Sequence, residues 1–215
     1  MAVVHLIRHG QASFGAAEYD ELSELGREQA RTVGGTLAAR QVRIDRVVSG
    51  SLRRQRDTAE FCLTAAGLAG QLSIDDRFDE YDHFGLAAAL PDSPAPTSSA
   101  EFQVVLDAAL ERWISGAMTP EGMPTWVDFA DRAWAGLDEF LAVLGKGGAG
   151  AAFTSGGVIT AICARLLGLP PNGSVALHRV VINGGITKVV AGRGGIALIS
   201  FNEHAHLPPD QVTYR

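Results

Sequence analysis

Cysteine is scarce in this chain, which holds only Cys62 and Cys163. Neither belongs to a CxxC pair, so the sequence offers no zinc ribbon and no disulfide scaffold. Both lie in apolar helical patterns, and we expect them to be buried, reduced thiols. Long apolar runs are missing as well. No run approaches the roughly 18 residues that a membrane-spanning helix needs, and the run over residues 1–7 is too short for the apolar core of a signal peptide.

Positive charge is also limited. The 18 Lys and Arg residues are outnumbered by 24 Asp and Glu residues, which gives a formal net charge of −6 at pH 7. No basic stripe stands out against this acidic background, so a nucleic-acid partner is not expected. A membrane partner is not expected either. The sequence therefore favours a cytoplasmic enzyme or binding domain.

Core-forming sequence, by contrast, is abundant. The 215 residues are 47% hydrophobic and 20% charged, a composition that supports a substantial core. Short apolar runs alternate with helical patterns along most of the chain. The expected strands cover residues 3–7, 44–48, 72–74, 149–153, 180–182, 187–190 and 196–200, and the expected helices cover 22–39, 52–66, 100–114, 126–144 and 157–167. This order predicts a three-layer α/β/α fold with a mainly parallel central sheet.

A stretch rich in proline and serine interrupts this pattern at residues 91–99. Such a composition cannot continue a helix and is typical of a loop. We interpret it as the start of a helical excursion over about residues 91–145 that partly covers the active cleft. The whole chain, residues 1–215, is then expected to form a single domain.

Arg8, His9 and Gly10 directly follow the first buried strand. In open α/β sheets, ligands bind beyond the carboxyl ends of the strands, so a guanidinium and an imidazole stand where a ligand is expected. Arginine is suited to holding a phosphate, and an imidazole can attack phosphorus that is presented in line. Taken alone, the tripeptide also fits a surface histidine that merely follows a strand.

A second element supports the functional reading, because residues 49–59 pass from a strand through a Ser/Gly turn into an arginine-bearing helix. With its neighbours, this element resembles the histidine phosphatase superfamily, also called the phosphoglycerate mutase-like or RHG family. The matching blocks are residues 6–11 (LIRHGQ), 22–30 (LSELGREQA) and 49–59 (SGSLRRQRDTA), followed by Glu80, 155–159 (SGGVI) and 183–187 (NGGIT). Ordered blocks in the expected strand and helix context are far more specific than one short motif.

The resemblance implies a role for each matching residue. His9 corresponds to the nucleophile that becomes a phosphohistidine, and Arg8 and Arg54 correspond to arginines that bind the phosphoryl oxygens. Glu80 corresponds to the general acid that protonates the leaving alcohol. The family needs no metal and no cofactor, which is coherent because phosphoryl transfer asks mainly for positioning and charge neutralisation. The two cations should also lower the pKa of His9, which keeps the nucleophile neutral at pH 7.

The sequence departs from the family pattern at Ser155. The family usually carries a second histidine there, which hydrogen-bonds the transferring phosphoryl group. Losing a transition-state donor of this kind typically costs about 3 to 4 kcal/mol. The Ser155 hydroxyl is expected to donate one replacement bond, or to cap the helix that begins near Gly157. Gly156 belongs to the same helix N-terminus, whose backbone amides are expected to bind phosphate.

His83 and His178 are the candidates to substitute for the missing imidazole. The alternative for either residue is a loop histidine without a catalytic part. Ser13, shortly after the first block, is a candidate phosphate contact. His204 and His206 suggest a metal pair, but no third ligand stands nearby in the sequence, so no metal site is expected.

Several other conspicuous residues are expected to be structural. The acids between the first block and the first helix should cap that helix or face water; they are Glu18, Asp20 and Glu21. The tryptophans should pack in the core or in a lid; they are Trp113, Trp126 and Trp134.

Together, these residues predict a metal-independent phosphomonoester phosphatase that acts on a small phosphorylated substrate or on a phosphoprotein. A phosphoglycerate mutase-type phosphotransferase is the first alternative, but it needs a second phosphate site, and few basic residues remain to build one. A catalytically degenerate protein that only binds a phosphorylated ligand is the second. The presence of both a nucleophile and an acid argues against it, and the oligomeric state is left open.

Overall fold

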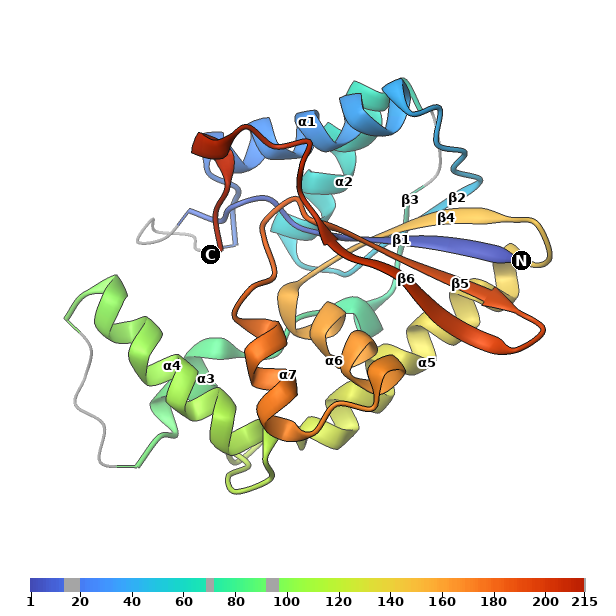
Figure 1. Ribbon diagram of the computed structural model, residues 1–215. Coiled ribbons are helices and arrows are strands. Elements are labelled where there is room, and N and C mark those ends of the chain that lie inside the picture. Colours follow the sequence, from blue (N-terminus) through green and yellow to red (C-terminus); the bar gives the residue numbers. More distant parts are fainter. Residues whose placement is uncertain (14–19, 69–71, 92–96, 215) are drawn as a thin grey trace.

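The computed structural model describes residues 1–13, 20–68, 72–91 and 97–214. In this part of the chain, six strands form one sheet in the order β3-β2-β4-β1-β5-β6 (Figure 1). The strands are β1 (Ala2–Arg8), β2 (Arg46–Ser49), β3 (Leu72–Ile74), β4 (Ala149–Thr154), β5 (Ile186–Gly192) and β6 (Gly195–Glu203). The first four pair in parallel, whereas β5 is antiparallel to β1 and β6 is antiparallel to β5. The expectation of a mainly parallel sheet is confirmed.

Helices cover both faces of this sheet, which confirms the predicted three layers (Figure 1). The described helices are α1 (Glu24–Ala39), α2 (Arg53–Ala66), α3 (His83–Ala88), α4 (Ser99–Ile114), α5 (Trp126–Leu144), α6 (Gly156–Leu167) and α7 (Pro171–His178), with short 3-10 turns η1 (Asp76–Phe78) and η2 (Pro209–Gln211). α1 and α2 lie on one face and pack against each other, and α5 and α6 lie on the other. α4 stands further out, beside α3 and α7.

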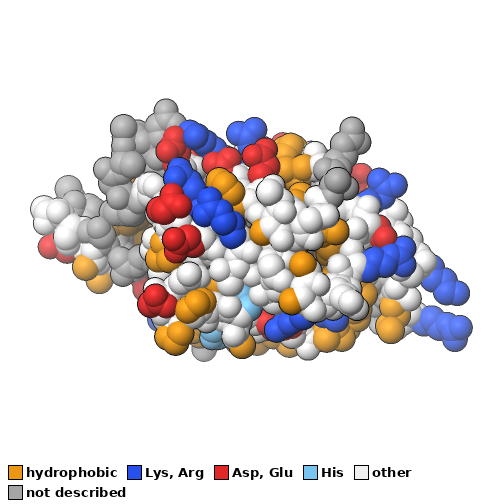
Figure 2. Space-filling view, turned by 90° about the horizontal axis from the view of Figure 1, so that it is seen from above, with side chains coloured by type: hydrophobic (Ala, Val, Ile, Leu, Met, Phe, Trp, Pro, Cys, Tyr) orange, Lys and Arg blue, Asp and Glu red, His pale blue; other side chains and the backbone are white. Residues whose placement is uncertain are grey.

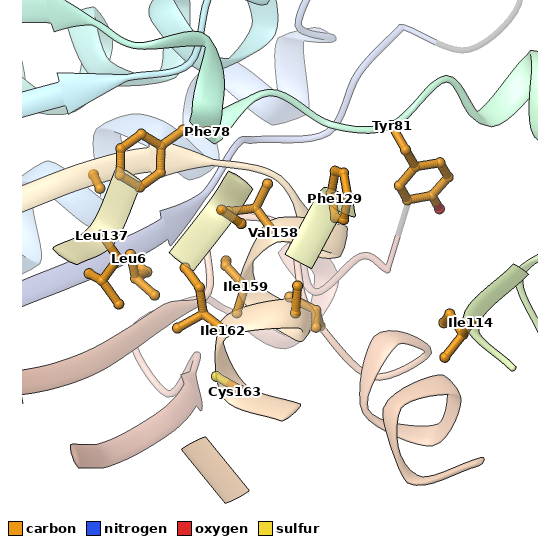
Figure 3. Close-up of a cluster of buried hydrophobic side chains, with 14 of the residues drawn as sticks. Leu6, Phe78, Tyr81, Ile114, Phe129, Leu137, Val158, Ile159, Ile162 and Cys163 are labelled. Atoms are coloured by element: carbon orange, nitrogen blue, oxygen red, sulfur yellow. The ribbon is translucent and has the colours of Figure 1, made fainter. Parts of the chain in front are cut away.

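Each face of the sheet has its own apolar core, because successive residues of a strand point to opposite sides. On the α1 and α2 face, Ile7 packs with Cys62. On the other face, Leu6 packs with Leu137 of α5 and Cys163 of α6 (Figure 3). Burial on both faces explains why β1 is a continuous apolar run. Both cysteines are buried and free, as expected, and burial raises the pKa of each thiol to about 12.

The register of β1 and β4 decides where the polar residues of the site meet. The two strands pair in parallel and end together, with Arg8 opposite Thr154. The His9 amide continues this pairing by donating to the Thr154 carbonyl over 2.9 Å. On the other side of β4, Ser49 at the end of β2 lies opposite Phe153. The segment after β1 therefore emerges at the same end of the sheet as the beginnings of α2 and α6.

Most of the expected strands and helices are present, with ends displaced by up to three residues. The prediction of a strand over 180–182 is wrong, because this segment follows α7 as a turn and an irregular stretch and belongs to no strand. The Asn202 side chain holds that turn, accepting from Ile182 N over 2.9 Å and donating to Val180 O over 2.6 Å. α7 itself was not predicted. Within the proline-rich loop, residues 92–96 lie outside the described part of the chain.

Acidic and basic side chains adjoin one another on the face shown in Figure 2. Over α1, for example, Glu24 pairs with Arg27 at 2.9 Å and with Arg31 at 3.6 Å. Such exposed pairs contribute little to stability. They do, however, break up the surface charge. Within the described residues, no helix is long and apolar enough to cross a membrane.

Candidate active site

A cavity of about 310 Å³ opens beyond the carboxyl end of β1. Its wall contains Arg8, His9, Arg54 and Glu80, which the sequence analysis singled out for phosphoryl transfer. These residues come from the end of β1, the first turn of α2 and the segment after η1. The fold thus gathers in one place side chains that are more than 70 positions apart in the printed sequence.

His9 lines the cavity. Its Nδ1 lies 2.7 Å from the Gly10 carbonyl, so Nδ1 carries the proton and donates it there. Nε2 is left with a lone pair, which faces Arg54 Nε at 3.3 Å. Burial, followed by the charges of Arg54 and Arg8, lowers the pKa of His9 well below its ordinary value of 6.5. The imidazole is therefore neutral at pH 7 and able to act as a nucleophile.

The loop that carries His9 is held by its backbone. Asn183 Nδ2 donates to the His9 carbonyl over 3.1 Å, and the Gly10 amide donates to Thr58 Oγ1 over 3.1 Å. Gly10 is also packed directly on α1, where a Cβ atom would stand 2.2 Å from the Gly26 carbonyl oxygen. Only glycine fits at this close approach. The backbone on both sides of the His9 ring is thus fixed by bonds that do not involve its Nε2 atom.

Two guanidiniums flank the imidazole. Arg54 is almost fully buried, and its Nη1 forms an ion pair with Asp20 at 2.6 Å. Arg8 Nη1 donates to the carbonyls of Val181 and of Tyr214, the latter over 3.0 Å. Planar guanidiniums are suited to paired hydrogen bonds with phosphate oxygens. The arrangement places two positive charges beside one neutral nucleophile.

Glu80 lies at the N-terminus of α6. Its Oε2 accepts from the Gly157 amide over 3.1 Å, and its Oε1 accepts from the Tyr81 amide over 3.3 Å. Burial raises the pKa of Glu80 above its ordinary value of 4.5, although these amides and the two arginines oppose the rise. A carboxyl group with a raised pKa in a cleft is a candidate general acid.

The turn that carries Glu80 is anchored on both sides. Asp79 accepts from the amide of Ser51 over 2.5 Å and from its hydroxyl over 2.6 Å. The Asp79 carbonyl accepts from Arg132 Nη2 over 2.6 Å. One residue earlier, the Phe78 carbonyl accepts from Thr154 Oγ1 over 2.7 Å. These bonds fix the carboxylate relative to β4 and α2.

Ser155 occupies the N-cap position of α6, but its side chain makes no capping hydrogen bond. Its hydroxyl is fully buried and accepts from Gln55 Nε2 over 2.8 Å. The same Gln55 nitrogen donates to the Phe78 carbonyl over 3.0 Å. Ser155 is not part of the described cavity wall. The adjacent Gly156 lies closer to the site, since a Cβ atom there would stand 3.5 Å from Arg8 Nε.

Both histidines proposed as substitutes do line the cavity. His83 begins α3, and its ring lies 4.2 Å from the Phe84 ring, centroid to centroid. His178 ends α7, and its Nε2 lies 3.3 Å from Tyr81 Oη. Burial lowers the pKa of each imidazole to about 4, so both are neutral at pH 7. Ser13 is not part of the described wall, and its amide donates to Glu21 O over 2.7 Å.

No three His, Cys, Asp or Glu side chains in the described ranges come together as a metal site. His204 and His206 each bond to a backbone carbonyl instead. His204 Nδ1 lies 2.7 Å from the Asn202 carbonyl oxygen, and His206 Nε2 lies 3.0 Å from the Gly184 carbonyl oxygen.

The parts that Asp20 and Gln55 play in the site were not predicted from the sequence. Asp20 was expected to cap α1 or to face water. Instead, Ser23 caps α1, and Asp20 pairs with Arg54 while accepting from the Arg53 amide over 2.7 Å. Gln55 was not singled out either. An amide side chain next to Arg54 needs hydrogen-bond partners wherever the fold buries it, and this was the available signal.

Comparison of the sequence with known families matches residues 4–204 to the histidine phosphatase superfamily, branch 1. A curated relative, glucosyl-3-phosphoglycerate phosphatase of Mycolicibacterium vanbaalenii, is 34% identical over 181 residues, which cover 77% of this chain and 74% of the relative. The mitochondrial serine/threonine-protein phosphatase PGAM5 of Rattus norvegicus is 28% identical over 214 residues, which cover 98% of this chain but 65% of that protein.

Solved structures of similar proteins share the fold of this chain. Mycobacterial glucosyl-3-phosphoglycerate phosphatase in complex with VO3 has a TM-score of 0.70 at 28% identity, over 94% of this chain and 99% of that chain. YhfR of Bacillus stearothermophilus has a TM-score of 0.74 at 19% identity, over 96% of this chain and 99% of that one, which shows the likeness of fold.

A neutral imidazole between two guanidiniums, at the carboxyl end of a parallel sheet, defines a site for phosphoryl transfer. The chain belongs to the histidine phosphatase superfamily, branch 1, and is a phosphatase of that superfamily.

Proposed function

We propose that the protein hydrolyses phosphomonoesters in two steps through a phosphorylated His9. Arg8 and Arg54 hold the phosphoryl oxygens. His9 Nε2 attacks phosphorus while the ester P–O bond breaks, and Glu80 gives its proton to the departing alkoxide. In the second step, a water gives a proton to Glu80 and attacks phosphorus. The P–N bond then breaks, which releases inorganic phosphate and returns His9 to its starting state.

The observation that carries this proposal is the state of the His9 ring. His9 lines the cavity, its Nδ1 proton is bound to the Gly10 carbonyl, and its Nε2 lone pair accepts from Arg54. A histidine that only packed a loop would have no reason to keep a lone pair directed at the guanidinium of Arg54. Once an anion occupies the cavity, Arg54 can turn to the phosphoryl oxygens and leave Nε2 open for attack.

The remaining wall favours a small substrate. A volume of about 310 Å³ is at the lower end for a pocket that encloses a small molecule. α4 contributes Phe102, Gln103 and Asp107 to the wall, so the alcohol part of the ester would lie against both apolar and polar groups. A panel of esters for assay can be chosen from the names of the relatives. Two of its members are glucosyl-3-phosphoglycerate and a phosphoserine peptide. We propose that the small ester is the better substrate.

Four further predictions rest on the sequence alone. Ser13 and Gly156 as phosphate contacts, a single domain over residues 1–215 and a cytoplasmic location stay predictions from the sequence.

Turnover of the panel by the whole protein tests the proposal, with p-nitrophenyl phosphate as a general substrate. His9→Ala is expected to abolish hydrolysis of every ester, because the nucleophile is gone. The exposed His204 offers a matched control, and His204→Ala should keep wild-type rates. Wild-type turnover by His9→Ala would refute the proposal. So would binding of the esters by the wild-type protein without any release of phosphate.

A further inference from the structure

α7 brings another imidazole into the cavity. His178 is the last residue of this helix, and its ring shares the cavity wall with Arg8, His9 and Glu80. Its Nε2 lies 3.3 Å from Tyr81 Oη. The Tyr81 residue directly follows Glu80, so the phenol and the carboxylate come from one segment.

The two glycines that begin α6 let these groups approach the start of the helix closely. A Cβ atom on Gly156 would stand 3.5 Å from Arg8 Nε and 3.9 Å from His178 Nε2. A Cβ atom on Gly157 would stand 2.2 Å from Glu80 Oε1. The guanidinium, the imidazole and the carboxylate therefore border the same small volume. A phosphoryl oxygen held there by Arg8 lies within reach of the His178 ring.

We propose that His178 is a catalytic residue of this enzyme, whose Nε2–H donates a hydrogen bond to an oxygen of the phosphoryl group during transfer. The proposal rests on the proposed function, because it assigns a donor to that same reaction. Such a donor is effective when it is held in place before the charge develops. The short distance to Gly156 puts it on the α6 side of the site.

Tyr81 holds the imidazole in the orientation that this role needs. The Tyr81 ring is itself fixed in the core, 5.1 Å from the Trp113 ring and 5.9 Å from the Phe129 ring, centroid to centroid. In this proposal His178 carries its proton on Nε2, and the Tyr81 oxygen at 3.3 Å is its acceptor. Burial and the charge of Arg8 keep this imidazole neutral. The phosphoryl group thus receives a hydrogen bond without a third positive charge in the site.

The other candidate donors differ from His178 in their surroundings. The Ser155 hydroxyl is buried against Gln55 and lies outside the described cavity wall. The His83 ring packs against Phe84 and stands 6.2 Å from the ring of Phe102, on the α3 and α4 side of the cavity. His83 also interacts electrostatically with His9 and Arg54, so variants at both histidines are compared.

Two substitutions at position 178 test the proposal. His178→Leu keeps an apolar side chain without a donor, and His178→Gln keeps an amide N–H near the position of Nε2. We expect His178→Leu to lower kcat and the affinity for vanadate by about 100-fold or more, because vanadate imitates the transition state, in which phosphorus is five-coordinate. His178→Gln should recover at least about tenfold of each loss. A wild-type kcat in His178→Leu, or equal losses in both variants, would overturn the proposal.

Controls separate the imidazole from the packing of its helix. Val175 is buried on the same helix and is not part of the described cavity wall, so Val175→Ala perturbs α7 but keeps the donor. It should retain kcat within about threefold, since uniform packing effects do not act on the transition state alone. If His83→Leu lowers vanadate affinity and His178→Leu does not, the donor is His83 and the proposal is wrong. An inactive His9→Ala alongside that result would leave the proposed function standing.

Discussion

Arg54 Nε donates to His9 Nε2 over 3.3 Å, so the guanidinium that we propose to bind the phosphoryl group occupies the lone pair of the proposed nucleophile. Asp20 anchors the same guanidinium through Nη1 at 2.6 Å. Binding of an anionic phosphoryl group offers Arg54 stronger acceptors than a neutral ring nitrogen. In our proposal, charge neutralisation and exposure of the nucleophile then occur in one event.

Removing this guanidinium should change the titration of His9. In Arg54→Met, the pKa of His9 is expected to rise toward 6.5, because one of the two cations that lower it is gone. The nucleophile works only when neutral, so the acid limb of kcat/KM should move to higher pH, and kcat/KM at pH 7 should fall by at least about 100-fold. NMR titration of the imidazole measures the pKa directly. Arg53→Met, which removes the exposed neighbour, is the matched control, and equal His9 titrations in both variants would contradict the account.

Glu80 should matter most for esters whose leaving group needs a proton. Glu80→Gln is expected to slow hydrolysis of alkyl phosphates by about 100-fold or more, since an alkoxide is a poor leaving group without general acid catalysis. Phosphorylation of the enzyme by p-nitrophenyl phosphate should slow far less, because p-nitrophenolate leaves unaided. Rapid-quench measurement of the first step with both esters shows the difference. The exposed Asp76 supplies a control, and equal slowing of both esters would exclude Glu80 as the acid.

Ser155 and Gln55 are expected to act on stability as a pair. Ser155→Ala removes the acceptor for a buried Gln55 N–H, which should cost about 1 to 3 kcal/mol of unfolding free energy. The kcat of this variant should stay within about tenfold of wild type, because Ser155 does not contact the described cavity. A double-mutant cycle with Gln55→Leu should give a coupling energy of about 1 kcal/mol. A fall in kcat without a fall in stability would instead make Ser155 a phosphoryl contact.

The buried imidazoles make stability depend on pH. His83 and His178 have pKa values of about 4 in the folded protein and about 6.5 when unfolded. Between these values the unfolded chain binds more protons, so stability is full above pH 6.5 and falls as the pH drops toward 4. Between pH 7 and pH 5, urea unfolding should show a loss of roughly 1 to 2 kcal/mol per imidazole. The variant H83Q/H178Q should lose correspondingly less over this interval, and an equal loss would contradict the burial of these rings.

The sequence predicted those parts of the site that depend on strand order. The apolar run of β1 and the polar residues after it placed Arg8 and His9 at the carboxyl end of a central strand. The helix after β2 carried Arg54 to the same place, because parallel strands present their carboxyl ends together. The strand expected over 180–182 failed for a tertiary reason, since the side chain of Asn202 binds the backbone there and bends it.

The partners of these residues could not be predicted, because they depend on contacts between distant segments. Asp20 meets Arg54 across 34 positions, and Gln55 meets Ser155 across 100. α7 escaped prediction because it has only eight residues and includes Gly173, a poor helix former, although Pro171 suits the first helical position. The helix is stabilised by its packing against α6 and α4. His178 reaches the cavity only through that packing.

The position of the phosphate on the enzyme tests the central claim most directly. Alkaline quenching during turnover, followed by 31P NMR and mass spectrometry of the labelled peptide, distinguishes the two nitrogens of a phosphohistidine. Because Nδ1 of His9 is bound to the Gly10 carbonyl, the phosphate is predicted on Nε2 of His9. Phosphate on Nδ1, on another residue, or on no residue of a protein that is turning over would contradict the account.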